Sequence, residues 1–109
     1  MALTREQIAA ACKREIQTFA IPGLGDICMR AVTGAEVRAV SDRIDPQVDI
    51  RGYTRAIAAA TACDEVGDRM PELEALLNDA PIYVVNAVID AALTINHMKP
   101  EAIEDARKD

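Results

Sequence analysis

The chain has 109 residues, half of them hydrophobic, but only two Tyr, one Phe and no Trp. This length fits one domain, residues 1–109, and an aliphatic core of this kind favours short helices that pack closely together. The net charge is −6 and no basic stripe is interleaved with aromatic residues, which argues against nucleic acid as a partner.

The first expected element is a helix over residues 5 to 14. Thr4 is a typical N-cap and Gln7 stands three places later, which is the pattern of a capping box. Ile8, Ala11 and Cys12 recur at helical spacing, so we expect this face of the helix to be buried in the core.

A β-hairpin is expected next, within the segment IQTFAIPGLGDICMRAV. β-branched and aromatic residues flank a central PGLGD segment, in which Pro22 and two glycines supply the backbone angles of a tight reversal. A lone two-stranded ribbon is marginally stable in water, so we expect a helix to cover it.

The TGAE segment predicts a second capping box, with Thr33 as the cap and Glu36 three residues later. The helix that it opens is expected over Gly34–Arg43. Asp45 and Pro46 end this helix, because a residue before proline avoids helical geometry. A polar connection then reaches to about residue 49.

Two further helices are expected, one on each side of Gly67. The alanine-rich stretch from residue 50 to residue 65 predicts the third helix, and PELEALLN predicts a short fourth helix that starts at Pro71. The residues that lie close to one stripe of the third helix are Tyr53, Ile57, Ala60, Thr61 and, just after the helix, Val66.

Acidic residues concentrate in the middle of the chain, where few basic residues face them. We interpret this stretch as a solvated face that keeps a small protein soluble, in preference to a site for a basic partner. The acidic set includes Asp64, Glu65, Asp68, Glu72, Glu74 and Asp79, against Arg51, Arg55 and Arg69.

The fifth helix is expected to be the most hydrophobic, with Asp79 as its cap and Pro81 in its first turn. No window reaches the roughly 20 apolar residues of a membrane span, so we expect no membrane insertion. Such a helix can also pair with its copy, so a homo-oligomer is an option. A last short helix is expected from Pro100. The stripe expected to face the core is Val85, Ile89, Ala92, Leu93 and Asn96.

The residues that commonly carry chemistry are few. His97 is the only histidine, and its place at the end of the fifth helix suits a helix C-terminus better than catalysis. Cys12, Cys28 and Cys63 are odd in number and lack CxxC spacing, so we interpret them as reduced core residues of a cytoplasmic protein without a leader. We therefore predict no catalytic, cofactor or metal site, and no enzyme.

The order of these elements resembles the tail assembly chaperones of long-tailed, siphophage-type bacteriophages over nearly the whole chain. The chain departs from the family pattern at Leu24, where an aromatic residue is common, and at His97, where glycine is common. The segments that carry the resemblance are LTREQI, the turn IPGLG, a strand that ends at Arg30, VTGAE, CDEVGDRM and the closing AALTINHMKPEAIEDARKD.

The resemblance implies a non-catalytic protein of the host cell cytoplasm, absent from the mature virion. It would bind the tape measure protein and help to recruit tail tube subunits. Contact would place helix against helix or groove, with aliphatic anchors and an acidic rim. The candidate contact residues lie on the fifth helix opposite its core stripe, unless all are buried within the domain: Ile82, Tyr83, Val84 and Val88.

Two other functions remain open at this stage. A structural neck or tail-completion protein would also be small, helical and acidic, but it would be found in purified virions. A small enzyme is the least favoured alternative, because a single histidine stands without a paired nucleophile and base.

Overall fold

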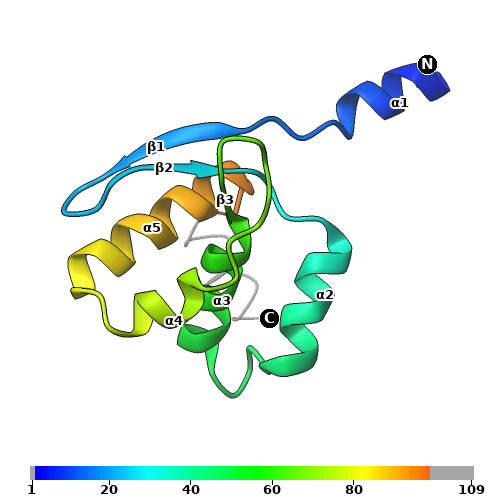
Figure 1. Cartoon of the computed structure of the whole chain (residues 1–109). Coiled ribbons are helices and arrows are strands. Elements are labelled where there is room, and N and C mark those ends of the chain that lie inside the picture. The colour runs from blue at the N-terminus through cyan, green and yellow to red at the C-terminus, as the bar shows by residue number, and fades with distance from the viewer. Residues whose placement is uncertain (1, 99–109) are drawn as a thin grey trace.

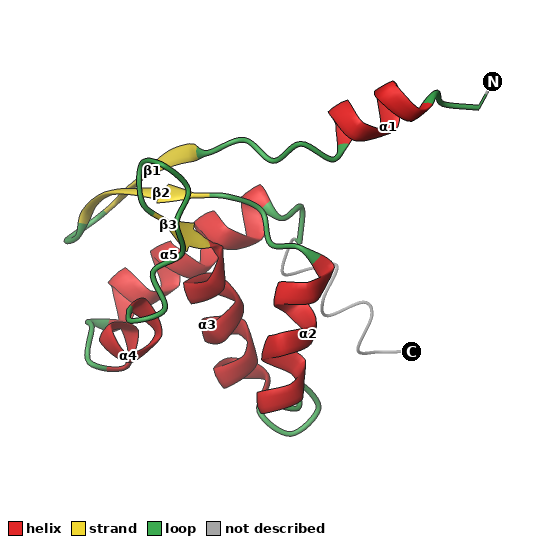
Figure 2. Ribbon diagram, turned by 45° about the vertical axis from the view of Figure 1, so that its right-hand side comes forward, coloured by secondary structure: helices red, strands yellow, loops and turns green. Residues whose placement is uncertain are grey.

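The computed structural model describes residues 2–98, which form five helices and a three-stranded antiparallel sheet (Figures 1 and 2). The expected helical fold with an early hairpin is therefore confirmed. The helix expected from Pro100 lies outside the described residues. The elements are α1 Arg5–Ala11, β1 Gln17–Ile21, β2 Gly25–Met29, α2 Gly34–Arg43, α3 Ile50–Thr61, β3 Ala62–Cys63, α4 Leu73–Asn78 and α5 Ile82–Ile95.

Helix α1 has the predicted capping box. The backbone N–H of Gln7 donates to the Thr4 hydroxyl at 3.2 Å, and the backbone N–H of Thr4 donates to Oε1 of Gln7 at 2.9 Å. The helix ends at Ala11, three residues before the expected end. The expectation of a buried face was wrong, because α1 has no buried residue and projects away from the other helices (Figure 1).

The predicted hairpin is present: β1 pairs with β2 in the register Phe19↔Ile27. The sheet has a third strand that was not expected: β3 pairs with β2 in the register Cys28↔Cys63. This pairing explains why α3 ends at Thr61 and not at residue 65, since the following two residues extend along β2.

The segment after β3 forms a tight loop around Asp64, whose Oδ1 accepts the backbone N–H groups of Val66 and Asp68, each at 2.9 Å. Gly67 in this loop has a φ of 94°, a conformation that glycine adopts at little cost. Val66 is 76% exposed, so the expectation that it lies on the apolar stripe of the third helix was wrong.

Helix α5 forms the centre of the main core and contacts both β1 of the sheet and α3 (Figure 1). Its predicted role as a core helix is confirmed. A second, smaller cluster joins α2 to α3 through Val40, Ala56 and Ile57. The main core comprises Ile21, Ile27, Met29, Ala58, Ala59, Ala62, Leu73, Leu77, Val84, Val85, Val88, Ala91, Ala92 and Ile95.

The ends of α4 and α5 differ in detail from expectation. Helix α4 begins at Leu73, two residues after Pro71. The N-cap of α5 is Pro81, with no side-chain hydrogen bond, so the expected capping by Asp79 was wrong. After α5 the backbone N–H of His97 donates to the Thr94 carbonyl and that of Met98 to the Leu93 carbonyl, which is a Schellman motif.

A network of polar side chains holds the elements in place around Glu36 of α2. Arg69 donates all five of its N–H groups, two to Glu36 and three to the backbone carbonyls of Arg30, Ala31 and Thr61. Burial raises the pKa of Glu36, but the hydrogen bonds and charge of Arg69 and the bonds from Thr33 outweigh it and lower this pKa to about 2.

Asn96 makes a second polar link, from the end of α5 to two distant segments. Its Oδ1 accepts the backbone N–H of Val32 at 2.9 Å, and its Nδ2 donates to the hydroxyl of Thr61 at 3.0 Å. Thr61 is fully buried and donates in turn to the Ile57 carbonyl at 2.7 Å. The end of α5 is thereby joined to α3 and to the connection between β2 and α2.

Candidate partner-binding groove

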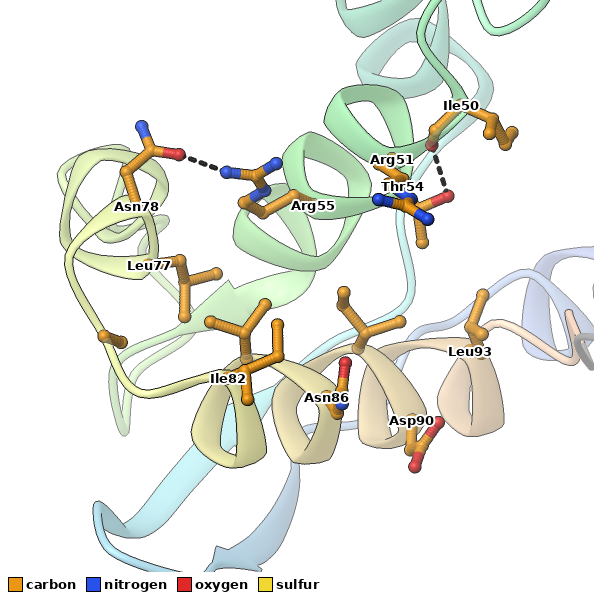
Figure 3. Close-up of a pocket in the computed structure, with 13 residues that line it drawn as sticks. Ile50, Arg51, Thr54, Arg55, Leu77, Asn78, Ile82, Asn86, Asp90 and Leu93 are labelled. Atoms are coloured by element: carbon orange, nitrogen blue, oxygen red, sulfur yellow. Dashed lines mark hydrogen bonds between the residues drawn. The ribbon is translucent and has the colours of Figure 1, made fainter.

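An open groove of about 790 Å³ lies between α3 and α5 and ends beside α4 (Figure 3). Aliphatic side chains from all three helices form its apolar part, and polar or charged side chains border it. We call this feature the α3–α5 groove. Its lining residues are Ile50, Arg51, Thr54, Arg55, Leu77, Asn78, Ala80, Ile82, Val85, Asn86, Ile89, Asp90 and Leu93.

The sequence of α3 explains why a groove opens here. Asp49 is the N-cap of α3, and its carboxylate accepts the backbone N–H of Gly52 at 3.0 Å, which fixes the direction of the first turn. The buried part of α3 consists mainly of alanines, which let the C-terminal half of α3 approach its neighbours closely. The N-terminal half carries Ile50, Arg51 and Thr54, whose side chains line the open space.

The charged groups of the groove are unevenly placed. Arg51 and Arg55 stand one turn apart on α3, and Nη1 of Arg55 donates to Oδ1 of Asn78 (Figure 3). Arg51 is exposed and makes no side-chain hydrogen bond or ion pair with residues 2–98. The carboxylate of Asp90 points away from α3 (Figure 3). The groove therefore presents more positive than negative charge.

The four sequence-predicted contact residues divide into two pairs. Ile82 is 71% exposed and Tyr83 is 57% exposed, so both are accessible at the start of α5. Val84 is only 4% exposed and Val88 is fully buried. Their prediction as surface residues was wrong, because they join the core residues of the hairpin and cannot reach a partner in this fold.

Tyr83 lies beside the tip of the hairpin. An added Cβ at Gly23 would come within 2.8 Å of the tyrosine ring, so this glycine makes room for the ring. Leu24, next to it in the turn, is 51% exposed. Of these exposed apolar residues at the start of α5 and the hairpin tip, only Ile82 lines the α3–α5 groove.

Arg51 and Arg55 are functional-site residues that were not predicted from the sequence, where they stand out only as rare cations in an acidic stretch. Their spacing of four residues in an expected helix was the available signal, because it places both side chains on one helix face. Their alignment with the aliphatic side chains of α5 depends on the packing of α3 against α5.

The remaining residues of chemical interest are dispersed. His97 is exposed beyond the end of α5. Cys63 is buried, Cys28 is half-buried and Cys12 is exposed, so the expectation of a core position was wrong for Cys12. Burial raises the pKa of the Cys63 thiol. Within residues 2–98, no three His, Cys, Asp or Glu side chains gather where they could hold a metal ion.

Comparison with protein families, curated protein sequences and solved structures found no match. None of the helices within residues 2–98 is long and apolar enough to cross a membrane. The α3–α5 groove, with Ile82 at its end, is the candidate functional site because it combines accessible aliphatic side chains with hydrogen-bonding groups in one concave surface.

Proposed function

We propose that this protein is a bacteriophage tail assembly chaperone that binds the tape measure protein and helps to recruit tail tube subunits during tail formation. The open α3–α5 groove supports this proposal, because it offers aliphatic side chains in a concavity between two helices. The identity of the client comes from the resemblance of the chain to that family. The groove supplies the physical means of holding it.

A groove between two helices is a common receptor for a third helix. The client helix lays its apolar face against the floor, and side chains at helical spacing anchor it. A tape measure is a long, helix-rich chain whose apolar faces would aggregate if left bare, so a helical chaperone that covers them keeps the chain soluble. Ile82 is suited to be an anchor, since it lines the groove and is largely exposed without a client.

The proposal includes a place of action. The chaperone would work in the host cell cytoplasm, where tails assemble, and would leave before the virion is complete. Acidic residues outside the groove suit this role, because Asp64, Glu65 and Asp68 are exposed and keep a chaperone soluble at the concentrations that assembly requires.

The test is co-expression of this chain with the tape measure protein encoded nearby, followed by pull-down and size-exclusion chromatography. We expect the tape measure protein to become soluble and to elute in one peak with this chain. The variant Ile82→Ser should reduce co-elution, whereas Val66→Ser should not, because Val66 is equally exposed but lies in the loop after β3.

Two results would overturn the proposal. One is a tape measure protein that stays insoluble while this chain elutes alone. The other is the presence of this chain in purified virions at the stoichiometry of a structural protein, which would assign it to the neck or to tail completion.

A further inference from the structure

The electrostatics of the α3–α5 groove differ from those of the whole chain. The chain carries a net charge of −6. The groove is lined by two arginines and one aspartate, and that aspartate, Asp90, points away from α3 (Figure 3). An apolar concavity bordered by cations favours a partner that brings carboxylates.

The two arginines have a fixed spacing. Arg51 and Arg55 are four residues apart on α3, so their side chains leave the same helix face about one turn apart. On α5, the opposite border of the groove is formed by Asn86, which is uncharged, and by Asp90, whose carboxylate points away from α3 (Figure 3). The positive charge is thus confined to the α3 border, so the two borders of the groove differ in charge.

We propose that the α3–α5 groove binds an amphipathic helix whose aliphatic stripe is bordered, on one side only, by two carboxylates about one turn apart. The aliphatic stripe packs on Ile50, Ile82 and Ile89, which line the groove and are not buried, and the two carboxylates face Arg51 and Arg55. The identity of this helix as a segment of the tape measure protein rests on the proposed function.

A helix is the partner that matches these features best. Two carboxylates four residues apart on a helix have the same spacing as Arg51 and Arg55 on α3, so both pairs form in one register. Arginine also pairs with carboxylates through two parallel hydrogen bonds, which favours this partner over a neutral helix. The groove lining contains no aromatic side chain on which a nucleotide base could stack.

The first experiment measures binding of two designed helical peptides to the full chain by fluorescence anisotropy. Both peptides are about 18 residues long and carry the same leucine stripe. One has two glutamates, four residues apart, on one border of the stripe, and the other has lysines at those positions. We expect the glutamate peptide to bind about tenfold more tightly, with an advantage that shrinks as salt rises.

Charge reversal on the protein locates the effect. Arg51→Glu should weaken binding of the glutamate peptide about fivefold or more and strengthen binding of the lysine peptide. Arg38→Glu is the matched control, because Arg38 is an exposed arginine of α2 that does not line the groove, and it should change neither affinity more than about twofold. Thermal unfolding of each variant confirms that it is folded.

Equal affinity for the two peptides, or equal effects of Arg51→Glu and Arg38→Glu, would overturn the inference. So would elution of the chain as a stable dimer that binds neither peptide, because a second copy would then fill the groove. If the glutamate peptide binds as expected but the tape measure protein does not co-elute, the chaperone proposal fails and the groove's preference stands. If the tape measure protein co-elutes with Arg51→Glu as well as it does with the parent chain, the chaperone proposal stands and the inference about the groove fails.

Discussion

Arg69 and Glu36 meet in a two-point ion pair, with Nε of Arg69 2.6 Å from Oε2 of Glu36 and Nη2 2.9 Å from Oε1. The residues are 33 positions apart in sequence. Because Arg69 also binds the carbonyls of Arg30, Ala31 and Thr61, this pair ties the loop after β3 to the end of β2 and to the start of α2. The pair therefore links segments that are distant in sequence.

Arg69→Lys should lower the free energy of unfolding by about 2 kcal/mol, because lysine keeps the charge but cannot supply five donors in a fixed plane. Arg43→Lys is the matched control. Arg43 pairs with Glu74 on the surface, where its side chain is 54% exposed, so its replacement should cost about 0.5 kcal/mol or less. Urea unfolding of both variants checks this. Equal losses would show that the network around Arg69 is dispensable.

Acid should weaken the fold partly through Glu36. The pKa of Glu36 in the folded chain, about 2, lies below that of an unfolded glutamate, about 4.3. A lowered folded-state pKa means that the stabilisation is complete above about pH 4.5 and is lost as the pH falls toward 2. Urea midpoints for the parent chain and for Glu36→Gln should therefore differ most near pH 7 and converge near pH 2. A difference that did not change with pH would contradict the assignment.

His97→Gly should stabilise the chain by about 1 kcal/mol. His97 has a φ of 57° in the Schellman motif after α5, a conformation that costs most residues about 1 kcal/mol but glycine very little. The melting temperature should rise by about 4 °C. His97→Ala is the control, since alanine keeps the penalty of a left-handed backbone, and it should give no such gain. Equal melting temperatures for the two variants would refute this explanation.

Gly23→Ala should destabilise the hairpin tip by about 2 kcal/mol. Its φ is 82°, and the added Cβ would lie 2.8 Å from the ring of Tyr83. Gly34→Ala is the control, because a Cβ there meets no atom within 4 Å and alanine favours the helix it joins. Chemical denaturation should show a loss for the first variant and a small gain for the second. Combining Gly23→Ala with Tyr83→Ala should recover the part of the loss that comes from the steric clash.

Removal of residues 2 to 11 should change the free energy of unfolding by about 0.5 kcal/mol or less, because no residue of α1 is buried. Leu77→Ala gives the contrasting case, since Leu77 is only 3% exposed and its loss should cost about 2 to 5 kcal/mol. Urea unfolding distinguishes the two. A large loss on removal of α1 would mean that this helix packs on the domain in solution.

The α3–α5 groove could be predicted only in part. Ile82 and Tyr83 were expected at the surface because they lie opposite the predicted core stripe of α5, and they are exposed. Val84 and Val88 shared that prediction and are buried, since α5 contacts the sheet on one side and α3 on another. A helix between two neighbours buries more of its circumference than one apolar stripe reveals.

The sequence alone determined the local features of this fold, namely the helix caps, the chain reversal and one helix end. The capping boxes at Thr4 and Thr33, the reversal at Pro22 and the helix end before Pro46 each depend on residues within a few positions, so their patterns are visible in the chain. Only the tertiary structure decided the short strand β3, the exposure of α1, the partners of Arg69 and the groove between α3 and α5. These features join residues far apart in sequence, and they form only when packing brings those residues together.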